Sequence, residues 1–257
     1  MALSVPDRPL RAPIGAEHVL FLKWLLLVVV LGFGFVGAWH YGLIGRVWTE
    51  DPTRITLGII VLFAVTFGAG AVHVYRLSSA LNHTADVEAW VERHGGVALR
   101  RALLVGGLHP PVPAGDVREH LGRVARKADQ SGGRVVDQRL LLRVFDASLR
   151  RGQGVGWFVA DLLLTLGLVG TVIGFIGMLA PLAGLDPTDA AGMKRAIGAM
   201  SGGMATALYT TLAGLVGGLL LRIQCLLLDE ASDEVLRRTT ELAELHLMPF
   251  PQAERAE

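Results

Sequence analysis

Four long apolar runs constrain this chain more than any other feature of its sequence. Each can cross a bilayer, which takes about 20 mainly apolar residues in a helix. The runs extend roughly over Val19–Trp39, Ile55–Tyr75, Trp157–Leu182 and Gly202–Leu221. With 52% hydrophobic and 18% charged residues, the chain is too apolar for an ordinary soluble domain. We therefore predict an all-α fold, a polytopic helical membrane protein with four transmembrane helices and a cytoplasmic helical extension.

Basic residues are unevenly distributed along the chain. Thirteen of the 24 Lys and Arg residues lie between Arg76 and Arg151. Because loops rich in Lys and Arg stay on the cytoplasmic side, we predict that this segment and both termini are cytoplasmic. Nucleic-acid binding explains the segment poorly, since acidic residues alternate with its arginines and it has one Trp and no aromatic series for base stacking.

The apolar runs and polar stretches divide the chain into five regions. Residues 1–18 contain three prolines and several charges, as expected of a cytoplasmic leader. Residues 19–75 hold the first two runs and predict a peripheral pair of transmembrane helices. Residues 76–156 repeat apolar residues at helical spacing and predict a cytoplasmic helical region. The last two runs fall within 157–228, and 229–257 form a cytoplasmic tail.

Signals for processing, metal binding and enzymatic chemistry are missing from the sequence. The first run ends at Trp39 without a small-x-small cleavage site, so we predict an uncleaved helix. Cys225 is the only cysteine, and His73 has no further ligand at helical spacing to complete a metal site. The polar region contains no P-loop, nucleophile elbow or zinc-protease motif. We expect neither an enzyme nor a bound metal or cofactor.

Helix boundaries can be predicted around the last run. Asp186 as N-cap, followed by Pro187, predicts the start of a short separate helix on the outer face. After Arg222 the last helix should continue into the tail and end before Pro249.

The last two runs carry Gly, Ala and Thr where a lipid-facing helix would carry Leu and Phe. On a helix of 3.6 residues per turn these small residues form continuous faces. Such faces let helix backbones approach closely. The predicted packing residues are Gly167, Gly170 and Gly174 in the third run and Ala207, Gly214 and Gly218 in the fourth.

Residue chemistry alone leaves two interpretations of the threonines open. In the first, each hydroxyl group bonds back to a carbonyl one turn earlier and the small residues only pack helix against helix. In the second, the clustered Thr206, Thr210 and Thr211, with Thr171 at a matching depth, line a polar path between the helices.

Two stretches resemble the paired signature of the MotA/TolQ/ExbB proton channel family. They are Leu166–Phe175 and Met204–Leu215, in the expected order on consecutive spans, and the similarity extends over about Leu162 to Leu228. Four spans with a large segment between the second and third are more similar to the MotA arrangement than to the three-span TolQ and ExbB arrangement.

This resemblance implies a protein of the bacterial cytoplasmic (inner) membrane that forms a pentamer around two copies of a single-span partner of the MotB/TolR/ExbD type. Protons, or sodium ions as in some relatives, would reach a membrane carboxylate on that partner. By motif position Thr171 and Thr211 match the family's pore threonines, and Thr206 and Thr210 complete the predicted pathway. Asp161 is either a helix-start charge or a proton exit group.

The sequence departs from the family pattern at three positions. Leu164 stands where the family often has a proline, Thr206 where TolQ and ExbB carry an acid, and Arg222 where MotA has a second proline. The absent prolines and the short tail argue against a flagellar stator, whereas Thr206 matches MotA-like members. Two other functions remain: a non-conducting oligomeric membrane scaffold, and a transporter, which is poorly supported because no span is interrupted by Pro-Gly beside a charged group.

Overall fold

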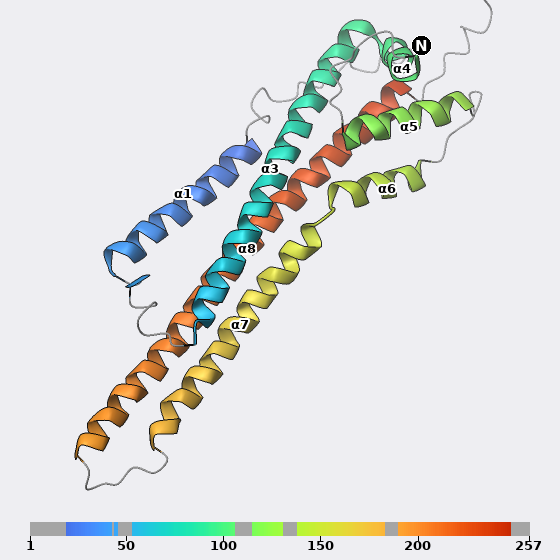
Figure 1. The fold of residues 1–257 in the computed structure, drawn as a ribbon. Helices are drawn as coiled ribbons and strands as arrows, with labels where there is room; N and C mark the ends of the chain where they lie inside the picture. Colours follow the sequence, from blue (N-terminus) through green and yellow to red (C-terminus); the bar gives the residue numbers. More distant parts are fainter. Residues whose placement is uncertain are drawn as a thin grey trace, which may run out of the picture.

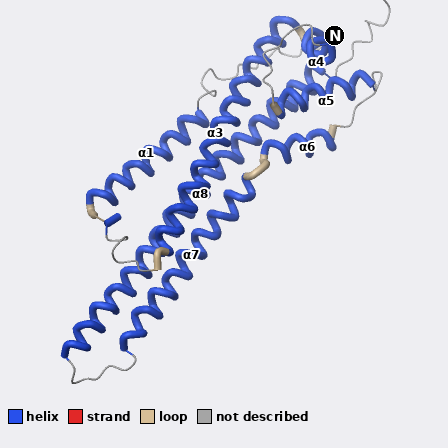
Figure 2. The backbone as a smooth tube through the Cα atoms, in the orientation of Figure 1, coloured by secondary structure: helices blue, strands red, loops and turns tan. Residues whose placement is uncertain are grey.

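All regular secondary structure in the described residues is helical, which confirms the predicted all-α fold. The computed structural model describes residues 19–42, 44–45, 53–105, 115–130, 138–182 and 190–247. The predicted leader, the Asp186-Pro187 helix start and the end of the tail lie outside these residues. The helices are α1 (Val19–His40), α3 (Ile55–His94), α4 (Gly96–Val105), α5 (Asp116–Gln130), α6 (Arg139–Leu149), α7 (Gln153–Leu179) and α8 (Ala190–Leu242) (Figures 1 and 2).

Four of these helices are long and apolar enough to cross a membrane. They are α1, α3, α7 with the 3₁₀ turn Ala180–Leu182, and α8 with the π-helical turn Ala243–Leu247. The prediction of a multi-pass membrane protein with four spans is therefore confirmed. We call the side of the membrane that carries α4, α5 and α6 the basic side.

Two antiparallel helices, α7 and α8, make the most extensive helix contact in the membrane part (Figure 1). Of the predicted peripheral pair, α1 lies at the edge of the bundle, whereas α3 packs along α8 and also contacts α7. The Trp24 ring of α1 stacks on Phe67 of α3, with ring centroids 6.3 Å apart. An exposed ion pair joins Lys23 to Glu230 of α8 at 2.9 Å.

The membrane helices continue without a break into the polar region. Helix α3 runs past Tyr75 to His94, and α8 runs for 53 residues. The predicted boundaries at 76, 157 and 229 therefore fall inside α3, α7 and α8. The prediction of a separate short helix before Gly202 is wrong, since α8 is already continuous from Ala190. No proline follows Pro187 until Pro249, so nothing in the backbone interrupts the helix.

The polar helices pack around the basic-side ends of α3 and α8. Helix α3 ends at His94 because the chain turns at Gly95, where φ is 81°. Only glycine adopts this conformation readily, which explains the turn. Helix α4 then folds back so closely that a Cβ atom on Gly96 would lie 2.5 Å from the His246 carbonyl oxygen.

A buried histidine lies between α5 and α6. His120 is 3% exposed, and its ring stacks on Phe145 with centroids 4.4 Å apart. Burial, reinforced by the positive charge of Arg123, lowers the His120 pKa from 6.5 to about 4. The imidazole is therefore neutral in the folded protein at neutral pH.

We expect His120 to make the fold acid-sensitive between about pH 6.5 and 4. In that window the unfolded chain binds a proton that the folded chain does not, so stability falls as pH falls. The measurement is the melting temperature as a function of pH. His120→Phe, which keeps an aromatic ring against Phe145, should flatten the curve, whereas the exposed-site control His83→Gln should follow the wild type. An unchanged slope in His120→Phe would contradict the assignment.

Candidate functional site

Glycines bring the backbones of α7 and α8 into contact. A Cβ atom on Gly174 would lie 2.6 Å from the carbonyl oxygen of Gly203 and 2.7 Å from the amide nitrogen of Ala207. One on Gly214 would lie 2.6 Å from the Leu163 carbonyl oxygen and 2.9 Å from the Gly167 Cα. We call this contact the glycine seam. All six predicted packing residues lie along it: Gly167, Gly170, Gly174, Ala207, Gly214 and Gly218.

Two of the four threonines are buried in the bundle. Thr206 is 2% exposed and Thr210 is fully buried. The Thr210 hydroxyl donates to the Thr206 carbonyl oxygen at 2.9 Å, which is the bond one turn back that the packing interpretation describes. The Thr210 side chain fills the space beside Gly170, where a Cβ would lie 2.7 Å from Thr210 Cγ2.

The other two threonines, Thr171 of α7 and Thr211 of α8, are half-buried, and we call them the edge threonines. The Thr171 hydroxyl donates to the Leu168 carbonyl oxygen at 2.5 Å. The Thr211 hydroxyl donates to the Ala207 carbonyl oxygen at 2.9 Å and lies 3.3 Å from the Gly167 carbonyl oxygen of α7. Thr211 therefore bridges the two helices and is the threonine most closely tied to both.

An ion pair joins the two helices nearer the basic side. The Arg222 Nη2 atom donates to Asp161 Oδ1 at 2.6 Å, and the two side chains are 45% and 64% exposed. Asp161 is the only charged residue in α7, and Arg222 is the only one in α8 between Arg195 and Asp229. Arg222 lies eleven residues, three helical turns, after Thr211, and thus on the same side of α8.

A polar cluster that we did not predict holds the start of α7 against α8. The buried Gln153 amide donates to Ser232 Oγ at 2.8 Å, and the Trp157 indole donates to Asp229 Oδ2 at 3.1 Å. Arg150 forms ion pairs with three acids, Asp146, Asp229 and Asp233. The hydrogen bond that Arg150 donates to Asp146, together with the negative charges of the three acids, raises the pKa of Arg150 above its usual value. This polar cluster fixes the register of α7 against α8 on the basic side of the Asp161–Arg222 ion pair.

A second unpredicted contact holds α3 against α8. The Gln224 side chain is 2% exposed and donates from Nε2 to the Phe67 carbonyl oxygen at 3.1 Å. Gly70 makes the room, because a Cβ atom there would lie 2.6 Å from Gln224 Nε2. Among the described residues, no group of three or more His, Cys, Asp or Glu side chains could hold a metal ion.

The glycine seam, its two edge threonines and the Asp161–Arg222 pair fall within one matched range. Residues 127–241 match the model of the MotA/TolQ/ExbB proton channel family. No curated protein and no solved structure matches the chain. The matched range runs from the last turn of α5 through α6 and α7 to near the end of α8. The match confirms the resemblance drawn from Leu166–Phe175 and Met204–Leu215, since both stretches lie inside residues 127–241, the part of the chain that is similar to this family.

Proposed function

We propose that this chain is the proton-conducting subunit of an ion-driven rotary or force-transducing complex in a bacterial inner membrane. One observation carries the proposal. Thr171 and Thr211, at the positions of the family's pore threonines, lie on the two helices that the glycine seam joins, and both are partly accessible. Their role is transport rather than enzymatic chemistry.

The hydroxyl groups of the edge threonines can line a path for a proton whose binding carboxylate lies on another protein. A hydroxyl group both donates and accepts hydrogen bonds without carrying a charge, so it can hydrate a carboxylate or hold a water chain inside a membrane. Asp161 is the only acid in α7, and it lies toward the basic side. The mid-membrane carboxylate is therefore supplied by a second protein, a single-span partner of the MotB/TolR/ExbD type.

The assembly we propose is a pentamer of this chain around two copies of the partner, with both termini and the basic side in the cytoplasm. Large apolar side chains remain exposed on α7 and α8 on either side of the seam, among them Leu168, Leu208 and Leu215. In a bilayer such residues face lipid or a neighbouring subunit. Protons are the proposed ion, and sodium is the alternative.

The test of this function is proton uptake by vesicles that contain the chain together with its single-span partner. A conducting complex acidifies the vesicle lumen when a proton gradient is imposed, and the chain without its partner does not. The competing function, a non-conducting oligomeric scaffold, predicts a stable oligomer with no proton flux in either case.

We further propose that Asp161 is the exit group of the path, held in place by Arg222. In that case Asp161→Asn lowers proton flux about tenfold or more, as expected when a proton-transfer group is lost. An exposed ion pair adds only about 0–1 kcal/mol of stability, so assembly should survive the change. The measurement is proton uptake normalised to the amount of assembled complex.

A matched control is the Lys23–Glu230 pair, which is similarly exposed and also joins α8 to another helix. Glu230→Gln removes an acid of the same kind away from the edge threonines and should conduct like the wild type. Equal flux in Asp161→Asn and Glu230→Gln would contradict the exit role while leaving the channel function intact.

A further inference from the structure

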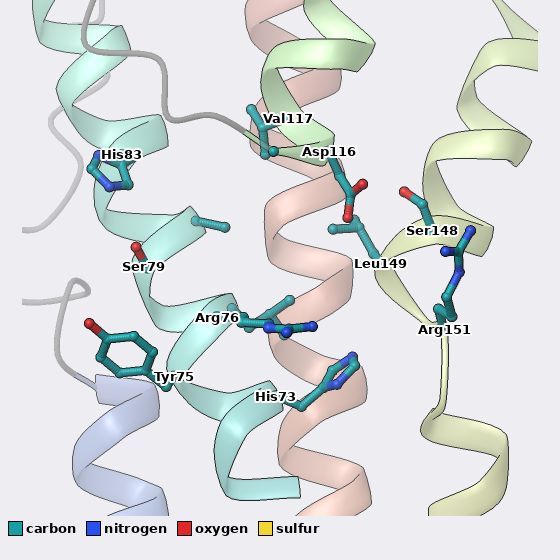
Figure 3. A pocket seen from close by; sticks show the side chains of 13 residues that line it. His73, Tyr75, Arg76, Ser79, His83, Asp116, Val117, Ser148, Leu149 and Arg151 are labelled. Atoms are coloured by element: carbon teal, nitrogen blue, oxygen red, sulfur yellow. The ribbon is translucent and has the colours of Figure 1, made fainter. Parts of the chain in front are cut away.

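A cavity with charged side chains in its lining lies at the basic-side end of the membrane helices, away from the glycine seam. It has a volume of about 550 Å³ and lies between α3, the start of α5 and the end of α6 (Figure 3). The polar lining comes from His73, Tyr75, Arg76, Ser79 and His83 of α3, Asp116 of α5, Ser148 of α6 and the following Arg151.

Two arginines give this cavity its charge. Figure 3 shows Arg76 and His73 extending from α3 toward the α6 side, and Arg151 standing beside Ser148. Neither guanidinium group forms an ion pair with any residue that the structure describes. Asp116 is the only acid in the lining. The arginines are thus left available for an anion, and Asp116 can accept a hydrogen bond from a hydroxyl group on the same ligand.

The cavity continues toward the interior of the polar helices. A second hollow of about 390 Å³ shares Asp116, Ser148 and Arg151 with the first. His120 lines this second hollow, and its buried Nε2 atom has no hydrogen-bond partner among the described residues. A polar ligand that extends from the first hollow into the second would reach another unpaired group.

The position of the cavity relative to the bilayer narrows the choice of ligand. Arg76 is the first charged residue after the apolar part of α3, and Arg151 lies two residues before α7 begins. Both therefore stand where phospholipid phosphates lie. One turn closer to the membrane centre, Val72 of α3 and Val155 of α7 are exposed and apolar. A phosphate at the arginines would have its acyl chains beside exposed hydrophobic residues.

We infer that this cavity binds the phosphate-bearing headgroup of an acidic phospholipid with a hydroxylated headgroup, such as phosphatidylglycerol. Guanidinium groups form strong, directional hydrogen bonds to phosphate, and basic pockets at helix ends favour acidic headgroups. The lipid would connect α3 with the α6–α7 junction. The inference does not depend on ion conduction, because none of the cavity residues belongs to the glycine seam or the Asp161–Arg222 pair.

The experiment measures lipid retained by the purified full-length chain. Protein stripped of lipid in detergent is titrated with phosphatidylglycerol or with phosphatidylcholine of the same acyl chains, and bound lipid is counted by native mass spectrometry. We expect saturable binding of phosphatidylglycerol and much weaker binding of phosphatidylcholine. Arg76→Gln combined with Arg151→Gln should weaken phosphatidylglycerol binding on the order of 30-fold, and the two Lys substitutions at these positions should restore most of it.

The matched control removes two exposed arginines outside the cavity. Arg101→Gln with Arg143→Gln changes the net charge equally and should bind like the wild type. Equal losses in the two double variants, or equal binding of the two lipids, would overturn the inference. It would also be overturned if inorganic phosphate bound at the arginines while phosphatidylglycerol did not, since the ligand would then be a soluble anion. Melting temperatures of all variants show whether each is folded.

Discussion

Gly174→Ala is expected to destabilise the protein by about 1–3 kcal/mol, the usual cost of overpacking a tight interior. The added methyl group has no space, because it would lie 2.6 Å from the Gly203 carbonyl oxygen and 2.7 Å from the Ala207 amide nitrogen. Both are backbone atoms, so no side-chain rotation relieves the clash. Helices α7 and α8 must move apart, and the bond between Thr211 and the Gly167 carbonyl oxygen lengthens with them.

The control is the same substitution three residues along the helix. A Cβ atom on Gly177 would meet nothing within 4 Å. Gly177→Ala should therefore leave the melting temperature unchanged or raise it slightly, since alanine favours a helix over glycine by about 0.8–1 kcal/mol. Thermal unfolding in detergent measures both variants. If Gly174→Ala has the same melting temperature as Gly177→Ala, the close contact between α7 and α8 is not present in the protein.

The residues of the glycine seam could be predicted from the sequence, because the periodicity of small residues can be read in each helix separately. Glycines at three- and four-residue spacing in α7, and small residues at the same spacing in α8, identify two faces without any knowledge of how they meet. Gly203 was missed, although a Cβ atom there would lie 2.7 Å from the Gly174 carbonyl oxygen. It was not distinguished from Gly202, which has no close neighbour.

Contacts between distant segments could not be predicted in this way. Gln224 is buried only because Gly70, more than 150 residues earlier, leaves room for its amide. The spacing of Gln153 and Trp157 places them on one face of a helix, but it does not identify Ser232 and Asp229 as their hydrogen-bond partners. These pairings depend on the relative register of helices, which tertiary packing decides.

The threonines show a different limit. Periodicity placed all four near the helix contact, yet Thr206 and Thr210 are buried whereas Thr171 and Thr211 are half-buried. A rotation of about 100° between successive residues separates Thr210 from Thr211. The orientation of α8 relative to α7 decides which of these two threonines is buried, and the sequence does not give that orientation.

Thr211→Val is expected to lower proton flux through the assembled complex about 10- to 100-fold. Valine keeps the shape of the side chain and removes the hydroxyl group, and a hydrogen bond to a charged group contributes about 1.5–3 kcal/mol. The structural cost is smaller, because only the bonds to the Ala207 and Gly167 carbonyl oxygens are lost. Thr171→Val should have a weaker effect, since its hydroxyl bonds only within α7.

A threonine away from the edge pair provides the control. Thr165 is exposed on α7 and donates to the Asp161 carbonyl oxygen at 2.9 Å, so Thr165→Val also removes one hydroxyl group from the same span. The decisive measurement is proton uptake by vesicles containing equal amounts of wild-type, Thr211→Val and Thr165→Val complexes with the single-span partner. The proposed path predicts flux in the wild type and Thr165→Val and its loss in Thr211→Val. Undiminished flux in Thr211→Val would contradict it.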